Sequence, residues 1–161
     1  MKVYIASDHA GFALKEALIA YLPGISLPGG VAPELEDMGA YSFSPDDDYP
    51  DVVTPCAQQV ALDDGSVGIV IGASGQGEAM VANRVLGIRA AVYYGSPRTM
   101  QSDVAGHELD MISSVRVHND ANILALGARF ITEDDAKEAV RVFLSTAFTR
   151  ESRHLRRIGK F

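Results

Sequence analysis

The residues best placed to do chemistry lie in a glycine-rich loop that directly follows a run of apolar residues. The run is residues 67–71, and the loop reads Gly72-Ala73-Ser74-Gly75-Gln76-Gly77-Glu78. Small residues let the backbone turn tightly, so its N–H groups can approach a ligand closely. If a helix begins near Glu78, its free N–H groups and the positive end of its dipole would add to the site. The loop therefore predicts a cradle for an anion.

Two common nucleotide-binding patterns do not fit this loop. A Walker motif requires Lys followed by Ser or Thr after its second glycine, whereas Gly77 is followed by Glu78 and Ala79. The dinucleotide fingerprint requires a glycine three positions after Gly77, where the sequence has Met80. The loop therefore lacks the motifs that usually indicate phosphoryl transfer or hydride transfer, and no cofactor is predicted.

Glu78 is unusual because it places a carboxylate in a loop suited to anions. One interpretation is that Glu78 only stabilises a helix N-terminus, as acidic side chains often do. The other is that Glu78 is a general base beside an oxyanion hole. Proton abstraction next to a carbonyl needs a base that acts on the carbon and donors that stabilise the enediolate oxygen. Ser74 would then carry protons between the two oxygens. The loop alone leaves both interpretations open.

Two further pairs of polar residues adjoin predicted strands. Asp8 and His9 follow residues 2–7, so they should lie at the carboxyl edge of a parallel sheet, where ligands bind. His118 and Asn119 lie just before residues 123–126. Taken singly, such a pair is more often a turn with local hydrogen bonds than a functional site.

The C-terminal segment is basic although the whole chain is acidic. Arg153 lies four residues before Arg157 and three before Arg156, so the three share one helical face. Like charges at this spacing oppose helix formation by roughly 0.2–0.5 kcal/mol per pair, so the cluster suggests a bound anion. A solvated or salt-bridged face is the alternative. Arg129, after residues 123–126, is a further candidate.

The sequence predicts no metal site. Residues 46–48 are three aspartates, which in a loop usually form a solvated run, and no His/Cys cluster has zinc spacing. The single cysteine, Cys56, lies in an apolar helical pattern and is expected to be buried.

Length and composition limit the class of protein. The 161 residues fit one domain, residues 1–161, with 47% hydrophobic and 22% charged residues, as in ordinary globular proteins. A net charge of −7 argues against a nucleic-acid partner. No segment reaches the roughly 18 apolar residues of a membrane helix, and the N-terminus has no signal-peptide pattern. We therefore expect a cytoplasmic protein with no membrane partner.

Segments typical of strands alternate with segments typical of helices. Strands are expected at residues 2–7, 36–38, 67–71, 89–94 and 123–126. Helices are expected at residues 12–22, 51–62, 133–146 and 151–158, with Thr132 as the N-cap before residue 133. The alternation predicts an α/β three-layer sandwich with a five-stranded, parallel, Rossmann-like sheet and a C-terminal helix.

In order and spacing, these pieces resemble the type B ribose-5-phosphate isomerases, a family that also contains the subunits of galactose-6-phosphate isomerase. The resemblance covers nearly the whole chain. Besides residues 72–78, it rests on Ser7-Asp8-His9-Ala10-Gly11, Asp48-Tyr49-Pro50, Ala82-Asn83-Arg84, Gly87-Ile88-Arg89-Ala90, His118-Asn119-Asp120-Ala121-Asn122, Gly127-Ala128-Arg129 and Arg153-His154-Leu155-Arg156-Arg157.

The resemblance implies a metal-free aldose–ketose isomerase and gives the catalytic residues their roles. Glu78 would move a proton between carbons 2 and 1 of the sugar, and Ser74 would serve the oxygens. Asp8 and His118 would open the furanose ring. The enediolate would be held by backbone amides of Gly75, Gln76, Gly77 and Glu78.

The resemblance also implies how substrate and subunits bind. Asn119 would bind a sugar hydroxyl, and the phosphate would be bound by His9, Arg129, Arg153 and Arg157. Family members are homodimers, often paired into tetramers, and their sites combine residues of two subunits. A sugar phosphate and a second copy of the chain are therefore the expected partners.

The chain departs from many family members at two places. Many use a cysteine base at the end of the central strand, where this chain has Gly72; others have a glutamate at the position of Glu78, and the chain resembles that subgroup. Residues 96–116 are several residues longer than in common members and include Arg98, Asp103, His107 and Glu108. The expected substrates are ribose 5-phosphate and ribulose 5-phosphate. The alternatives are a six-carbon sugar phosphate, such as allose or galactose 6-phosphate, and a non-catalytic sugar-phosphate-binding protein.

Overall fold

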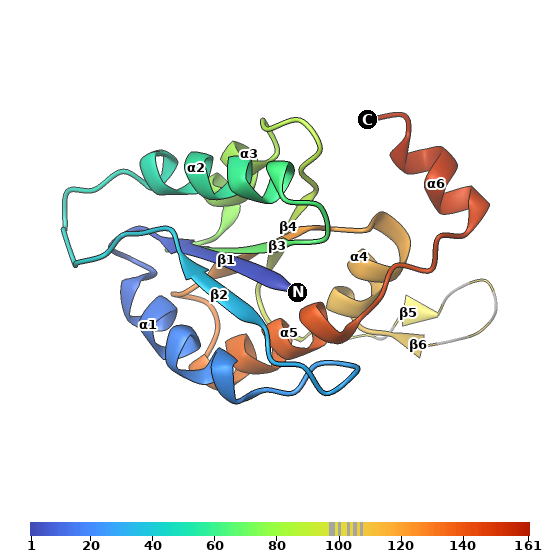
Figure 1. The fold of residues 1–161 in the computed structure, drawn as a ribbon, viewed down its shortest axis with the longest axis horizontal. Coiled ribbons are helices and arrows are strands. Elements are labelled where there is room, and N and C mark those ends of the chain that lie inside the picture. The colour runs from blue at the N-terminus through green and yellow to red at the C-terminus, as the bar shows by residue number, and fades with distance from the viewer. Residues whose placement is uncertain (97–98, 100, 103, 105, 107) are drawn as a thin grey trace.

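The computed structural model is built around a parallel sheet of five strands (Figure 1). The strands are β1 (Lys2–Ser7), β2 (Glu34–Asp37), β3 (Val67–Gly72), β4 (Ala90–Tyr93) and β7 (Ile123–Gly127), in the spatial order β2-β1-β3-β7-β4. All neighbouring strands are parallel, which confirms the predicted sheet. The structure describes every residue except 97, 98, 100, 103, 105 and 107, so Arg98, Asp103 and His107 lie outside the described residues.

Helices cover both faces of the sheet (Figure 1). On one face, α1 (Phe12–Tyr21) and α5 (Glu133–Ser145) bury Leu18 and Phe143; on the other, α2 (Tyr49–Leu62) and α3 (Gln76–Ala82) bury Cys56 and Ala79. Every residue of β3 is buried, as expected for a central parallel strand with helices on both sides. The predicted three-layer sandwich and the buried Cys56 are confirmed. Burial raises the pKa of the Cys56 thiol to about 12.

Local capping sets the start of α5 where the sequence predicts it. The Thr132 hydroxyl accepts a 3.1 Å hydrogen bond from the Asp135 N–H, and the Asp135 carboxylate accepts one of 3.2 Å from the Thr132 N–H. This reciprocal capping box satisfies two otherwise unpaired donors. The C-terminal helix, α6 (Ser152–Ile158), also lies where it is expected.

Several elements lie where the sequence pattern predicts none. Helix α4 (Met111–Asn119) begins after Asp110, whose carboxylate accepts a 2.8 Å hydrogen bond from the Ser113 N–H. Its side chains are mostly polar, so it lacks a clear apolar stripe. Before it lie two short antiparallel strands, β5 (Gln101–Ser102) and β6 (Glu108–Leu109), and α1 continues into a short 3₁₀ turn, η1 (Leu22–Gly24).

Candidate active site

Three strands end in register and bring three predicted site segments together. The Asp8 N–H, after β1, donates a 3.3 Å hydrogen bond to the Ile71 carbonyl at the end of β3. The Arg129 N–H, after β7, donates one of 3.1 Å to the Ala73 carbonyl. Asp8, His9, residues 72–78 and Arg129 thus form one group at the carboxyl edge of the sheet, which we call the carboxyl-edge group.

The glycine-rich loop turns as tightly as its composition predicts. Gly75 is the N-cap of α3 with a φ of 73°, and a Cβ there would lie 3.0 Å from the backbone of Leu126. A Cβ on Gly77 would lie 2.7 Å from the Tyr49 ring. The Ser74 hydroxyl accepts a 3.3 Å hydrogen bond from the Gln76 N–H. Glycine is therefore needed where this loop contacts β7 and α2.

The Glu78 side chain lies against the end of β3 and is only 3% exposed. A Cβ placed on Gly72 would lie 1.8 Å from Glu78 Oε1, so the carboxylate fills the space that a side chain on residue 72 would need. Burial raises the pKa of Glu78 above its ordinary value of 4.5; the charge of Asp8 also raises it, while the N–H groups of Glu78 and Gly75 oppose the rise. Glu78 lies in the first turn of α3, as the helix-stabilising interpretation expects, and its carboxylate is also buried beside the glycine-rich loop.

Asp8 is a second buried carboxylate at this edge. Its Oδ1 accepts hydrogen bonds from the N–H groups of Ala10 (3.0 Å) and Gly11 (3.1 Å). The turn with local hydrogen bonds that the sequence suggests is therefore present. It also holds the Asp8 carboxylate close enough to Glu78 for their charges to interact.

His9 is paired with an aspartate that the sequence assigns to a solvated run. Asp47 Oδ1 lies 2.7 Å from His9 Nδ1 and accepts a 2.9 Å hydrogen bond from the His9 N–H. The solvated interpretation is wrong for Asp47, because only the fold brings it to the end of β1. The hydrogen bond to Asp47 raises the pKa of His9 above 6.5, and burial opposes this rise only in part.

The other predicted site residues line a separate hollow of about 430 Å³, which we call the α4–α6 pocket. His118 and Asn119 come from the end of α4, and Arg153 and Arg157 come from α6. His118 Nδ1 lies 3.2 Å from the Ser114 hydroxyl. The remaining lining residues are Ser102, Val104, Ser114 and His154.

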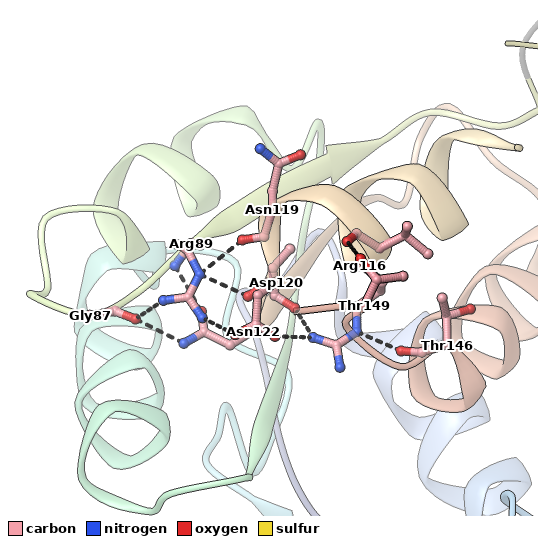
Figure 2. A network of polar contacts seen from close by, with 10 residues as sticks. Gly87, Arg89, Arg116, Asn119, Asp120, Asn122, Thr146 and Thr149 are labelled. Carbon is pink, nitrogen blue, oxygen red and sulfur yellow. Dashed lines mark hydrogen bonds and ion pairs between the residues drawn. The ribbon is translucent and has the colours of Figure 1, made fainter. Parts of the chain in front are cut away.

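A network of polar contacts holds the end of α4 in place (Figure 2). Arg89 Nε donates to the carbonyl oxygens of Asn119 (3.0 Å) and Asp120 (2.8 Å), and its Nη2 lies 3.0 Å from the Asp120 carboxylate. Arg116 is buried and donates to the carbonyl oxygens of Ala121 and Thr146. The network therefore ties the end of α4 to β4 and to the chain that leads from α5 into α6.

The carboxyl-edge group and the α4–α6 pocket lie at opposite edges of the sheet. The Gly68 N–H donates a 2.8 Å hydrogen bond to the Asn122 carbonyl, so the chain after α4 adjoins the start of β3. Glu78 lies at the other end of β3, and a strand of six residues spans roughly 16–20 Å. In Figure 1, α4 and α6 likewise lie away from the carboxyl end of β1. One chain alone therefore does not gather the predicted residues into one site.

Among the described residues, no group of three or more His, Cys, Asp or Glu side chains could hold a metal ion. Within the same residues, no helix has the length and apolar character needed to cross a membrane.

Comparison with known proteins shows the family. The family described as Ribose/Galactose Isomerase matches residues 3–161. The chain belongs to this family. One relative is ribose-5-phosphate isomerase B of Mycolicibacterium paratuberculosis, which is 37% identical over 158 residues, 98% of this chain and 87% of the relative.

Solved structures of ribose/galactose isomerase family members have the same fold. Ribose 5-phosphate isomerase B of Thermotoga maritima matches with a TM-score of 0.80 and 40% identity over 99% of this chain and 95% of that chain. The Mycoplasma genitalium enzyme, solved with bound ribulose 5-phosphate, matches with a TM-score of 0.81 and 32% identity over 99% and 92%. The predicted family and fold are confirmed.

Proposed function

We propose that this family member interconverts ribose 5-phosphate and ribulose 5-phosphate through an enediolate. The observation that carries the proposal is the buried Glu78 carboxylate beside the backbone N–H groups of Gly75 and Glu78. The named relatives, one of them with ribulose 5-phosphate bound, support the choice of substrate. The reaction needs no external oxidant, because oxidation at carbon 2 balances reduction at carbon 1.

Glu78 is the base in this mechanism. Its carboxylate takes the proton from carbon 2 of the open-chain aldose, the C–H electrons form the double bond to carbon 1, and negative charge develops on oxygen 1. Amides of Gly75 to Glu78 stabilise that charge. Ser74 moves the hydroxyl proton from oxygen 2 to oxygen 1, and Glu78 then protonates carbon 1 to give the ketose. Its raised pKa suits it to both halves of this transfer.

Ring opening needs separate residues, because ribose 5-phosphate closes a furanose ring through oxygen 4. Asp8 and His118 are proposed to move the protons that open it. Ribulose 5-phosphate cannot close a five-membered ring, since oxygen 5 carries the phosphate. Reactions that begin and end at the ketose therefore do not require these two residues.

Substrate binding requires both groups of residues. His9 and Arg129 of the carboxyl-edge group and Arg153 and Arg157 of the α4–α6 pocket are proposed to bind the phosphate, and Asn119 a sugar hydroxyl. Because the groups lie at opposite edges of one chain, we propose a homodimer, alone or paired into a tetramer. Each active site then combines the carboxyl-edge group of one subunit with the α4–α6 pocket of the other. The proposed location of the enzyme is the cytoplasm.

Turnover of defined sugar phosphates by the purified protein tests the proposed function. We expect ribose 5-phosphate to be converted faster than galactose 6-phosphate or allose 6-phosphate, with no loss of rate in the presence of a metal chelator. Faster turnover of a hexose phosphate would mean that the substrate is a six-carbon sugar phosphate, which the family's description also allows. Binding of sugar phosphates without any turnover would contradict the isomerase.

Replacing Gly72 with alanine is expected to lower turnover by about 10²-fold, the typical cost of misplacing a catalytic group by about 1 Å. The new Cβ and Glu78 Oε1 cannot share the same space, so the carboxylate must move. Gly24→Ala is the matched control, because a Cβ there meets nothing within 4 Å. Steady-state kinetics would measure both variants, and equal turnover would contradict the placement of Glu78.

Replacing Asp47 with asparagine is expected to weaken phosphate binding at neutral pH. The raised pKa keeps His9 charged below that pKa, and the charge is lost as pH rises through it. In Asp47→Asn the pKa of His9 should fall, so the rise of KM with pH should begin at lower pH. KM measured from pH 5.5 to 9 checks this, with Asp46→Asn as the control. Identical dependence of KM on pH in the unaltered enzyme and in Asp47→Asn would mean that the charge of His9 does not contribute to substrate binding.

A further inference from the structure

His154 is a buried ring that lies flat against the proposed ring-opening histidine. The residue is 3% exposed, and its ring stacks on that of His118 with centroids 4.7 Å apart and planes inclined by 26°. Both rings line the α4–α6 pocket. His118 also contacts Ser114 through Nδ1, so its ring is held from its edge and from one face. Loss of the His154 ring would therefore leave the plane of His118 poorly fixed.

Arg153 determines the protonation of His154. Arg153 Nε donates a 3.2 Å hydrogen bond to His154 Nε2. A guanidinium has no acceptor, so Nε2 must carry a lone pair, and the ring is neutral with its proton on Nδ1. Glu151 shares the same Arg153 nitrogen, because its Oε2 lies 2.8 Å from Arg153 Nε, and its Oε1 lies 3.9 Å from the His154 ring nitrogen.

The surrounding charges favour the same neutral state. Burial lowers the pKa of His154, and the positive charges of Arg153, His118 and Arg157 lower it further, against the opposing effect of Glu151. A neutral ring can remain stacked when His118 takes up a proton, whereas an imidazolium in its place would repel that proton. The pocket therefore combines a proton-transferring histidine with a neighbouring histidine that stays uncharged.

We propose that His154 is a positioning residue that links phosphate binding to ring opening, an inference that rests on the proposed function. Through the stack it fixes the plane of His118, so that this ring can exchange a proton with the sugar. Through Nε2 it holds Arg153 Nε together with the Glu151 carboxylate, which leaves the terminal nitrogens of Arg153 to bind phosphate. One buried ring thus sets the geometry of two site residues from different helices.

Two substitutions separate the stack from the hydrogen bond. His154→Leu loses both, whereas His154→Phe keeps a flat ring and loses only the acceptor for Arg153. Both variants should raise KM to a similar extent. His154→Leu should lower kcat for ribose 5-phosphate by about 10²-fold through misplacement of His118, whereas His154→Phe should stay within about threefold of the unaltered enzyme.

Exchange of the carbon 1 protons of ribulose 5-phosphate with D₂O separates a loss of ring opening from general damage to the enzyme, because general damage would slow this exchange as well. This exchange needs no ring opening, so it should stay within about threefold in His154→Leu, which misplaces only His118. Leu155→Ala, at the next residue of α6, is the control and should leave kcat and exchange unchanged.

Three results would overturn the proposal. The first is an unchanged kcat in His154→Leu, and the second is an equal loss of turnover and exchange in that variant. The third is a low kcat in His154→Phe although the midpoint of its thermal unfolding is the same as that of the unaltered enzyme. A failure of the proposed function would look different, because the unaltered protein would then convert no sugar phosphate at all.

Discussion

Replacing Glu78 with glutamine is expected to lower kcat for ribose 5-phosphate by about 10²–10⁴-fold, the contribution typical of a general base. Glutamine keeps the size of this buried side chain but cannot accept the proton from carbon 2. Exchange of the carbon 1 protons of ribulose 5-phosphate with D₂O should fall equally, because it passes through the same enediolate. Steady-state kinetics and proton NMR would measure the two rates.

Substrate binding should survive this substitution, since the loop amides and the phosphate-binding residues are unchanged. Glu138→Gln is the matched control, because Glu138 is exposed on α5 and pairs with Arg141 at the surface. The raised pKa of Glu78 also predicts that kcat falls with acidification at a pH above 4.5, as the carboxylate becomes protonated. Turnover of Glu78→Gln within threefold of the unaltered enzyme would mean that another group is the base.

Replacing His118 with asparagine is expected to separate ring opening from proton transfer. Turnover of ribose 5-phosphate should fall by about 10²-fold, at the lower end of the range for general acid–base catalysis. Carbon 1 exchange of ribulose 5-phosphate should be nearly unchanged, because the ketose is already open and Glu78 is intact. The same two assays measure this contrast. Equal losses in both would place His118 in the proton-transfer step, and no loss in either would remove it from the reaction.

The sheet and the loop could be predicted because their signals are local. Residues 67–71 are apolar on both faces, as a central parallel strand requires, and the small residues after them identify the loop. Glu78 stood out because its charge contradicts the loop's preference for anions. The position of its carboxylate, in the space beside Gly72, depends on how the backbone turns and appears only in the folded chain.

Contacts between distant segments could not be read from the sequence. Asp47 lies 38 residues from His9, and nothing in a run of three aspartates indicates which one reaches the end of β1. Helix α4 was missed because its mostly polar surface gives no apolar periodicity. The stack of His154 on His118 depends on how α6 packs against α4, so the spacing of the two histidines carries no signal of it.

The division of the candidate site between two edges of the sheet is the feature on which the proposed mechanism depends. The proposed mechanism therefore requires a second subunit, since Glu78 and His118 of one chain belong to different groups. Glu78→Gln and His118→Asn each damage every site of a homodimer. A mixed dimer of the two variants, however, has one site with native Glu78 and native His118, and one site with both residues altered.

Mixing the two nearly inactive variants tests most directly whether the active site is shared between two subunits. The two proteins are unfolded and refolded together at equal amounts, and turnover of ribose 5-phosphate is measured. Random pairing makes half of the dimers mixed, with one intact site in two, so a shared active site predicts recovery of about one quarter of the unaltered activity. A mixture no more active than the sum of the two separate variants would contradict an active site shared between subunits.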